Sequence, residues 1–200
     1  MNAKRKALQT KTRKEPLAYL LCWTSGIDGS TAMGPKDGKW DYLPKDQYVD
    51  IWTPIRLELP KPFFEDYLGN SKGFQLFSER FRDFIECHKQ PKDRFQWLEN
   101  PVICGKEERP YFILHFYDAD NVLDESRIIW HPVDNESILK PAFSAKKIQG
   151  HSLFTYVDPP SVCNMDSIYV TKELKHAILK SGMTGATFEA TCITNDLQGE

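Results

Sequence analysis

The stretch from Ser167 to Ala190, SIYVTKELKHAILKSGMTGATFEA, constrains the fold more than any other part of the chain. Its first residues, Ile168 to Val170, are strand formers. Thr171 suits a helix N-cap because its hydroxyl can accept a hydrogen bond from an N–H of the first turn. Apolar residues then recur at helical spacing, and Gly182 favours the left-handed conformation that ends a helix. The sequence predicts a strand, a capped amphipathic helix, a turn and a second strand.

The same pattern occurs between Gln75 and Leu98. Ser78 takes the N-cap position, and Phe81, Phe84 and Ile85 follow at the same offsets as the apolar residues after Thr171. Either one strand–helix–strand unit is duplicated, or two helices pack on one sheet through equivalent faces. A capped amphipathic helix also gives these offsets without any duplication. In each case the helix faces are core, and Phe84→Ala is expected to cost about 3–5 kcal/mol.

Length and composition are typical of one domain, with or without a smaller lobe. The chain has 200 residues and 12% aromatic residues, enough for a substantial core. Residues 1–15 have no apolar periodicity and are predicted to be a disordered basic leader. Residues 16–72 are predicted to form an N-terminal portion of the same domain or a small lobe, and residues 73–195 an α+β domain.

The net charge of −2 conceals an uneven distribution along the chain. The first 15 residues hold six basic residues and one acidic residue, which leaves 20 basic and 27 acidic residues in the remainder, a net −7. An acidic body argues against nucleic-acid binding and suits a basic partner.

The cysteine pattern favours a reducing compartment. The five cysteines are odd in number and form no C-x-x-C motif, so a cytoplasmic protein is expected. No apolar run approaches the ~20 residues of a membrane span, and the N-terminus lacks the apolar region of a signal peptide. No membrane association, cofactor or structural metal is expected.

The rest of the chain is rich in predicted strands. A continuous apolar run predicts a strand that is buried on both faces, and alternating residues predict half-buried strands. The strand predicted at 111–117 is expected to form a hairpin with the strand predicted at 127–131, across the acidic turn at 118–125. The predicted strands are Leu17–Trp23, Ile55–Leu59, Phe95–Leu98, Val102–Cys104, Tyr111–Tyr117, Arg127–His131 and Leu153–Val157. The predicted class is α+β, with a mixed or mostly antiparallel sheet and two capped amphipathic helices.

Four pieces of the chain, in this order, resemble a bacterial immunity-protein family of polymorphic toxin systems, immunity protein family eleven. They are LFSERF at 76–81, ILHFYDADNVLDES at 113–126, the segment 148–154 with Ile148, Gly150, Leu153 and Phe154, and the segment 168–188 with its closing T-G-x-x-F turn. The resemblance covers about residues 73–193. It implies a non-enzymatic protein that binds and neutralises a cognate toxin, and it carries no catalytic residues. The basic leader is not part of the family pattern.

The acidic turn is the strongest candidate site. Asp118, Asp120, Asp124 and Glu125 place four carboxylates within eight residues. They either cap the backbone of a solvated turn or face a basic partner, such as the active site of a nuclease toxin. Calcium binding is a weaker alternative, because the EF-hand spacing is absent.

Two rival functions use other residues. His115 with Asp118 and Asp120 has the composition of a metal-dependent hydrolase site, although His115 shares a strand face with apolar residues and suits a hydrogen-bonded core position. The long turn-rich loop 25–45, with Trp40 and Tyr42, could serve a protein-binding scaffold. No phosphate-binding glycine motif occurs.

Overall fold

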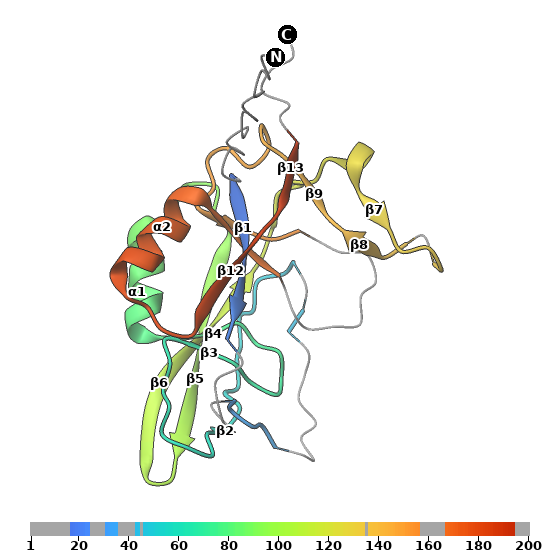
Figure 1. The fold of residues 1–200 in the computed structure, drawn as a ribbon. Helices are drawn as coiled ribbons and strands as arrows, with labels where there is room; N and C mark the ends of the chain where they lie inside the picture. The colour runs from blue at the N-terminus through green and yellow to red at the C-terminus, as the bar shows by residue number, and fades with distance from the viewer. Residues whose placement is uncertain are drawn as a thin grey trace, which may run out of the picture.

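Two larger β-sheets, two small two-stranded sheets and two α-helices make up the fold, which is α+β as predicted (Figure 1). The computed structural model describes residues 17–24, 31–35, 43–44, 46–134, 136–156 and 167–194. Within these ranges the elements are, in order, β1 (Ala18–Trp23), β2 (Leu57–Glu58), β3 (Tyr67–Leu68), β4 (Leu76–Ser78), α1 (Glu79–His88), β5 (Phe95–Cys104), β6 (Glu107–Phe116), the 3₁₀ turn η1 (Glu125–Arg127), β7 (Ile129–Trp130), β8 (Ile138–Lys140), β9 (Ala142–Ser144), β10 (Leu153–Phe154), β11 (Ile168–Thr171), α2 (Lys172–Ser181), β12 (Ala186–Ala190) and β13 (Cys192–Thr194).

The five-stranded sheet has the order β2-β5-β6-β4-β3 and is built around the long β5–β6 hairpin. Where two short strands are predicted, at 95–98 and 102–104, β5 is continuous. Pro101 lies opposite Pro110 of β6, a pairing in which neither ring nitrogen needs to donate across the ladder. The prolines therefore do not break the hairpin, and the predicted division of this strand is wrong.

The four-stranded sheet has the order β10-β11-β1-β12 and is antiparallel throughout. Strand β1 lies between β11 and β12. Its two faces contribute to two different core clusters, in agreement with the predicted burial of both faces. Strands β1 and β2 come from residues 16–72 and pair with strands from residues 73–195. The division of the chain into a lobe or one domain stays a prediction.

The two strand–helix–strand units repeat one arrangement. Strands β4 and β5 run parallel with β6 antiparallel between them, and strands β11 and β12 run parallel with β1 antiparallel between them. Strand β3 flanks β4 as β10 flanks β11. The predicted repetition is confirmed. The two helices belong to different sheets, so the alternative of two helices on one sheet is wrong.

Both helices begin at the predicted caps. Ser78 Oγ accepts a hydrogen bond from Phe81 N at 3.2 Å, and Thr171 Oγ1 accepts one from Leu174 N at 3.4 Å. These bonds satisfy N–H groups that have no partner within the helix. Gly182 ends α2 in the left-handed conformation, with φ 68°.

One apolar core joins the two sheets through the helices. Phe81 and Ile85 of α1 and Leu174 and Ile178 of α2 are buried in it, together with side chains of both sheets. Arg80 of α1 also donates to the carbonyl of Ser181 at the end of α2, at 2.7 Å. Side chains of both helices and of both sheets thus form one continuous core.

The expectation that Phe84 is a core residue is wrong. Its ring is half-buried at the margin of the core and packs against the ring of His88 at a tilt of 30°, with 4.3 Å between ring centroids. Its counterpart Ala177 of α2 is also half-buried. The main core aromatic of α1 is Phe81, which has no exposed surface.

The turn after α2 is locked to the strand β3. Asp66 accepts hydrogen bonds from the backbone N–H of Thr184 at 3.0 Å and from Ser78 Oγ at 2.8 Å. Beside them, Gly185 has φ 77°, and a Cβ there would lie 2.2 Å from the backbone oxygen of Tyr67. The T-G-x-x-F turn is therefore a structural joint between the two sheets.

Gly185→Ala is expected to destabilise the protein by about 2 kcal/mol, because it combines a strained left-handed residue with an overlap against backbone. Gly182→Ala is the matched control. Its φ is also positive, but a Cβ there meets nothing within 4 Å, so the cost should be about 1 kcal/mol. Urea unfolding of both variants measures the difference, and equal costs would contradict the role of the close approach.

The hairpin predicted across the acidic turn is wrong. Strand β6 pairs with β5 along its whole length and with β4 over Tyr111–Ile113, and β7 is not among its partners. Strand β7 pairs with β8 instead. The acidic stretch is thus a crossing segment that leads from the five-stranded sheet to a separate two-stranded ribbon.

Candidate functional site

The acidic segment, residues 118–125, is held in place by its apolar middle. Val122 and Leu123 are buried in a core cluster shared with β9 and β11. The backbone N–H of Ser144 donates to Val122 O at 3.1 Å, and that of Asp124 donates to Ala142 O at 2.8 Å. The buried side chains and these hydrogen bonds fix the backbone of the segment, and so also the positions from which the flanking carboxylates extend.

Asp124 has a structural role. Its side chain accepts hydrogen bonds from Ser126 N at 3.2 Å and Ser126 Oγ at 2.6 Å, and so caps η1. Hydrogen bonds from Ser126 and Thr194 hold the pKa of this carboxyl below its usual range. The capping alternative is therefore correct for Asp124.

The other three carboxylates are exposed. Asp118 has φ 52°, in the left-handed region, where the chain turns away from β6. Asp120 lies 3.2 Å from the ring of His151, and Glu125 accepts from Asn121 Nδ2 at 3.3 Å. Among the described residues, none of these three carboxylates forms an ion pair with a lysine or arginine within 4.0 Å. Asp118 and Glu125 thus have no basic partner among the described residues, whereas Asp120 lies within ion-pair distance of His151.

A pocket of about 320 Å³ opens between the acidic segment and the two-stranded ribbon. We call it the ribbon pocket. Two of the predicted carboxylates, Asp120 and Glu125, line it, whereas Asp118 and Asp124 do not. Its lining is Ala119, Asp120, Asn121, Val122, Leu123, Glu125, Ile128, Trp130, Ile138 and Tyr156. Carboxylates and aromatic rings therefore meet in one concave site.

The ribbon, residues 129–140, extends away from both helices and carries exposed apolar side chains (Figure 1). Ile129, Val133 and Leu139 are 51%, 84% and 59% exposed, and Trp130 is 39% exposed. A small element with this much exposed apolar surface is typical of an interaction site.

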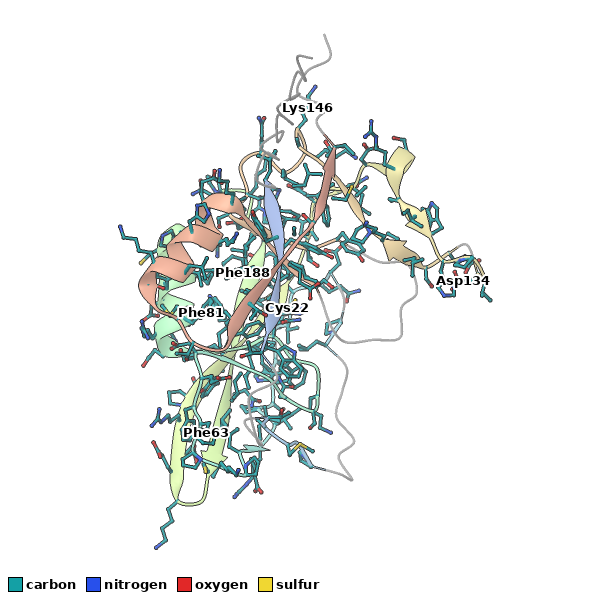
Figure 2. The ribbon with its side chains drawn as sticks, viewed as in Figure 1. Cys22, Phe63, Phe81, Asp134, Lys146 and Phe188 are labelled. Carbon is teal, nitrogen blue, oxygen red and sulfur yellow. The ribbon has the colours of Figure 1, made fainter. Side chains whose placement is uncertain are left out.

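Asp134 orders the outer end of the ribbon, where Figure 2 shows it. Its carboxylate accepts hydrogen bonds from the backbone N–H groups of Glu136 at 2.9 Å and Ser137 at 3.0 Å. These bonds, with that from Ser137 first, lower the pKa of Asp134 to about 2. The turn is thus organised by an ionised aspartate.

The pKa of Asp134 is lower in the folded turn than in an unfolded chain. The ionised carboxylate therefore stabilises the turn above its ordinary pKa, and this stabilisation is lost as the pH falls through about 2. We expect the amide resonances of Glu136 and Ser137 to change in step between about pH 4 and about pH 2. An NMR titration measures this, and Asp134→Asn should abolish the transition. A midpoint near pH 4 would show that the hydrogen bonds do not form.

A buried histidine stands behind Asp120. His151 Nδ1 lies 3.3 Å from Asp93 Oδ1, and its Nε2 lies 3.2 Å from Asp120 Oδ2. Neither contact is aligned as a hydrogen bond, although both lie within ion-pair distance. Asp93 is buried and also accepts from Ser152 Oγ at 2.6 Å and Gln90 N at 2.7 Å. The network fixes the histidine and leaves Asp120 at its exposed end.

His115 is the hydrogen-bonded core residue that its strand face predicts. Its ring is 2% exposed, and its Nε2 is 2.7 Å from Gln47 O. Within the ranges that the structure covers, no group of three or more His, Cys, Asp or Glu side chains is placed to hold a metal ion. His115 is thus engaged by the backbone, while Asp120 contacts a different histidine.

Some predicted features lie outside the described residues. These are the loop aromatics Trp40 and Tyr42 and the basic leader 1–15. In the described part of the chain, neither helix has the length and apolar character needed to cross a membrane.

Sequence reasoning missed the apolar half of the site. Trp130, Ile138 and Tyr156 line the pocket with the carboxylates. Trp130 falls in a predicted strand, but alternation alone does not reveal that the strand has only one partner. The signal in the sequence is a tryptophan five residues after the acidic run. Neither the family models nor the curated proteins compared with the chain give a match.

Proposed function

We propose that this chain is a non-enzymatic bacterial immunity protein that binds and neutralises a cognate polymorphic toxin. The supporting observation is the ribbon pocket, where exposed carboxylates and exposed apolar side chains share one concave surface. Protein interfaces combine an apolar, aromatic centre with charged groups that select the partner. The sequence resemblance to immunity protein family eleven agrees with this role.

The charge of the site favours a basic partner. Asp118, Asp120 and Glu125 are among the carboxylates that give residues 16–200 a net charge of −7. Such a surface attracts a toxin whose own active site is positively charged for phosphate, and it repels nucleic acid. The partner is therefore a protein, and neutralisation follows from covering its active site.

Binding is preferred over hydrolysis because the histidine of the hydrolase alternative is otherwise engaged. His115 is buried and hydrogen-bonded to Gln47 O. The same proposal places the protein in the cytoplasm, where its partner would act. The described cysteines, Cys22, Cys87, Cys104 and Cys192, are free thiols, which suits a reducing compartment.

Stoichiometry tests the proposal. The toxin encoded beside this chain's gene is held at a fixed concentration, and its activity is titrated with the purified protein. A binding inhibitor removes activity linearly and reaches zero at a one-to-one ratio. If a small fraction of an equivalent inactivates all the toxin over time, the chain is an enzyme and the proposal fails. If excess protein leaves the activity unchanged, it is not the immunity partner.

A further inference from the structure

The walls of the ribbon pocket specify a ligand with an apolar stem and a charged head. Its lining includes the buried Val122 and Leu123, and Ile128 and Ile138 add further apolar surface. The rings of Trp130 and Tyr156 supply flat aromatic surface. A fully polar ligand would leave this surface unmatched.

The charged groups of the pocket select a cation. Asp120 and Glu125 both line it. An anion would be repelled by both, and a purely apolar group would strip water from them without replacing its hydrogen bonds. A guanidinium satisfies both needs, because its planar fork donates to carboxylates and its face stacks on aromatic rings. A lysine ammonium can donate to the carboxylates, but it has no planar face to stack on the aromatic rings.

The buried His151 gives independent support. Its side chain is 3% exposed, and it lines a small void that shares Ala119, Asp120 and Val122 with the ribbon pocket. Its ring nitrogens lack aligned hydrogen-bond partners, and Nε2 lies 3.2 Å from Asp120 Oδ2. A buried ring at this distance restricts the side chain of Asp120. His151 is thus a positioning residue for Asp120.

We infer that the ribbon pocket binds one arginine side chain presented by the partner protein. The stem of the arginine lies along the isoleucines, and its guanidinium meets Asp120 and Glu125 beside Trp130. Since the partner is the toxin of the proposed function, the inference rests on that function for its biological meaning. The chemical preference of the pocket can be measured without the toxin.

The probe is the capped tripeptide acetyl-Ala-Arg-Ala-amide, titrated into the full ¹⁵N-labelled chain. The indole N–H resonance of Trp130, assigned by its absence in Trp130→Phe, should shift saturably. The citrulline peptide has the same shape but no charge, and it should bind about tenfold more weakly. The lysine peptide should fall between the two.

Variants locate the binding. The double variant Asp120→Asn/Glu125→Gln should weaken arginine binding about tenfold at an unchanged melting temperature, because both side chains are exposed. Glu108→Gln, at the exposed end of the β5–β6 hairpin, should leave it unchanged. His151→Gln should weaken arginine binding less than the double variant and should reduce the preference for the arginine over the citrulline peptide, a loss of selectivity that a merely structural role would not produce.

The inference is overturned if arginine and citrulline peptides bind equally, or if the Trp130 resonance does not respond. That failure leaves the proposed function standing if the toxin is still neutralised at a one-to-one ratio. Conversely, selective arginine binding without any neutralisation overturns the proposed function and supports the pocket chemistry alone.

Discussion

Phe81→Ala is expected to cost about 3–5 kcal/mol of stability, the largest effect of any single substitution considered for this fold. Phe81 has no exposed surface and packs in the core that joins the two sheets. Its ring lies 4.9 Å from that of Phe77 and 6.5 Å from that of Tyr67. The deletion leaves a cavity between elements that cannot close independently. The free energy of unfolding of a typical domain is about 5–15 kcal/mol in total, so the stability of this variant should be marginal at 37 °C.

Phe84→Ala is the matched control, since it removes the same atoms one helical turn later. Its ring is half-buried and packs against the tilted ring of His88, so the cost should be about 1–2 kcal/mol. Urea denaturation of both variants gives the comparison, with the slope of the unfolding free energy against urea as a check on two-state behaviour. Equal losses of stability in the two variants would contradict the structure, in which Phe81 is buried and Phe84 lies at the margin of the core.

Trp130→Ala is expected to weaken toxin binding about 100-fold, because buried aromatic residues at the centre of an interface carry much of its energy. Trp130 is 39% exposed in the free protein and stands beside Asp120 and Glu125 in the pocket. Its ribbon is a small appended sheet, so the melting temperature should change little. Isothermal titration with the toxin measures the loss.

Ile51→Ala controls for the general effect of removing exposed apolar surface. Ile51 is 87% exposed and does not line the pocket, so its removal should leave toxin affinity unchanged. If Ile51→Ala weakens binding as much as Trp130→Ala, the interface extends over the wider apolar surface. If neither variant changes affinity, the ribbon is not in the contact.

The helices were predictable because their signals are local. Ser78 and Thr171 precede apolar residues at fixed offsets, and hydrogen bonds within a few residues decide where each helix begins. The extent of burial was less predictable. Phe81 and Phe84 have the same chemistry, and only the position of the second sheet makes the first a core residue and the second a margin residue.

Strand pairing could not be derived in the same way. The sequence predicts a strand at Tyr111–Tyr117, but the partners of the observed strand β6, which are β4 and β5, both precede it in the chain. A hairpin with the following strand was the local expectation, and long-range pairing overruled it. The site depends on the same event, because the displaced strand β7 pairs with β8 and brings Trp130 to the acidic segment.

The four carboxylates of the acidic segment separate into two roles that composition alone does not distinguish. Asp124 caps η1, and Asp120 and Glu125 line the pocket. Asp124→Asn should therefore lower stability and leave toxin affinity nearly unchanged. The opposite is expected for the double variant Asp120→Asn/Glu125→Gln.

The toxin affinity of that double variant tests the central proposal most directly. It is measured by titration calorimetry at low and high salt, with Asp124→Asn and Glu108→Gln in parallel and the melting temperature of each recorded. We predict an affinity loss of about tenfold or more at low salt, a smaller loss at high salt because screening weakens the charge attraction, and an unchanged melting temperature. Unchanged affinity at low salt, with the protein still neutralising the toxin, would contradict the placement of the contact at the ribbon pocket.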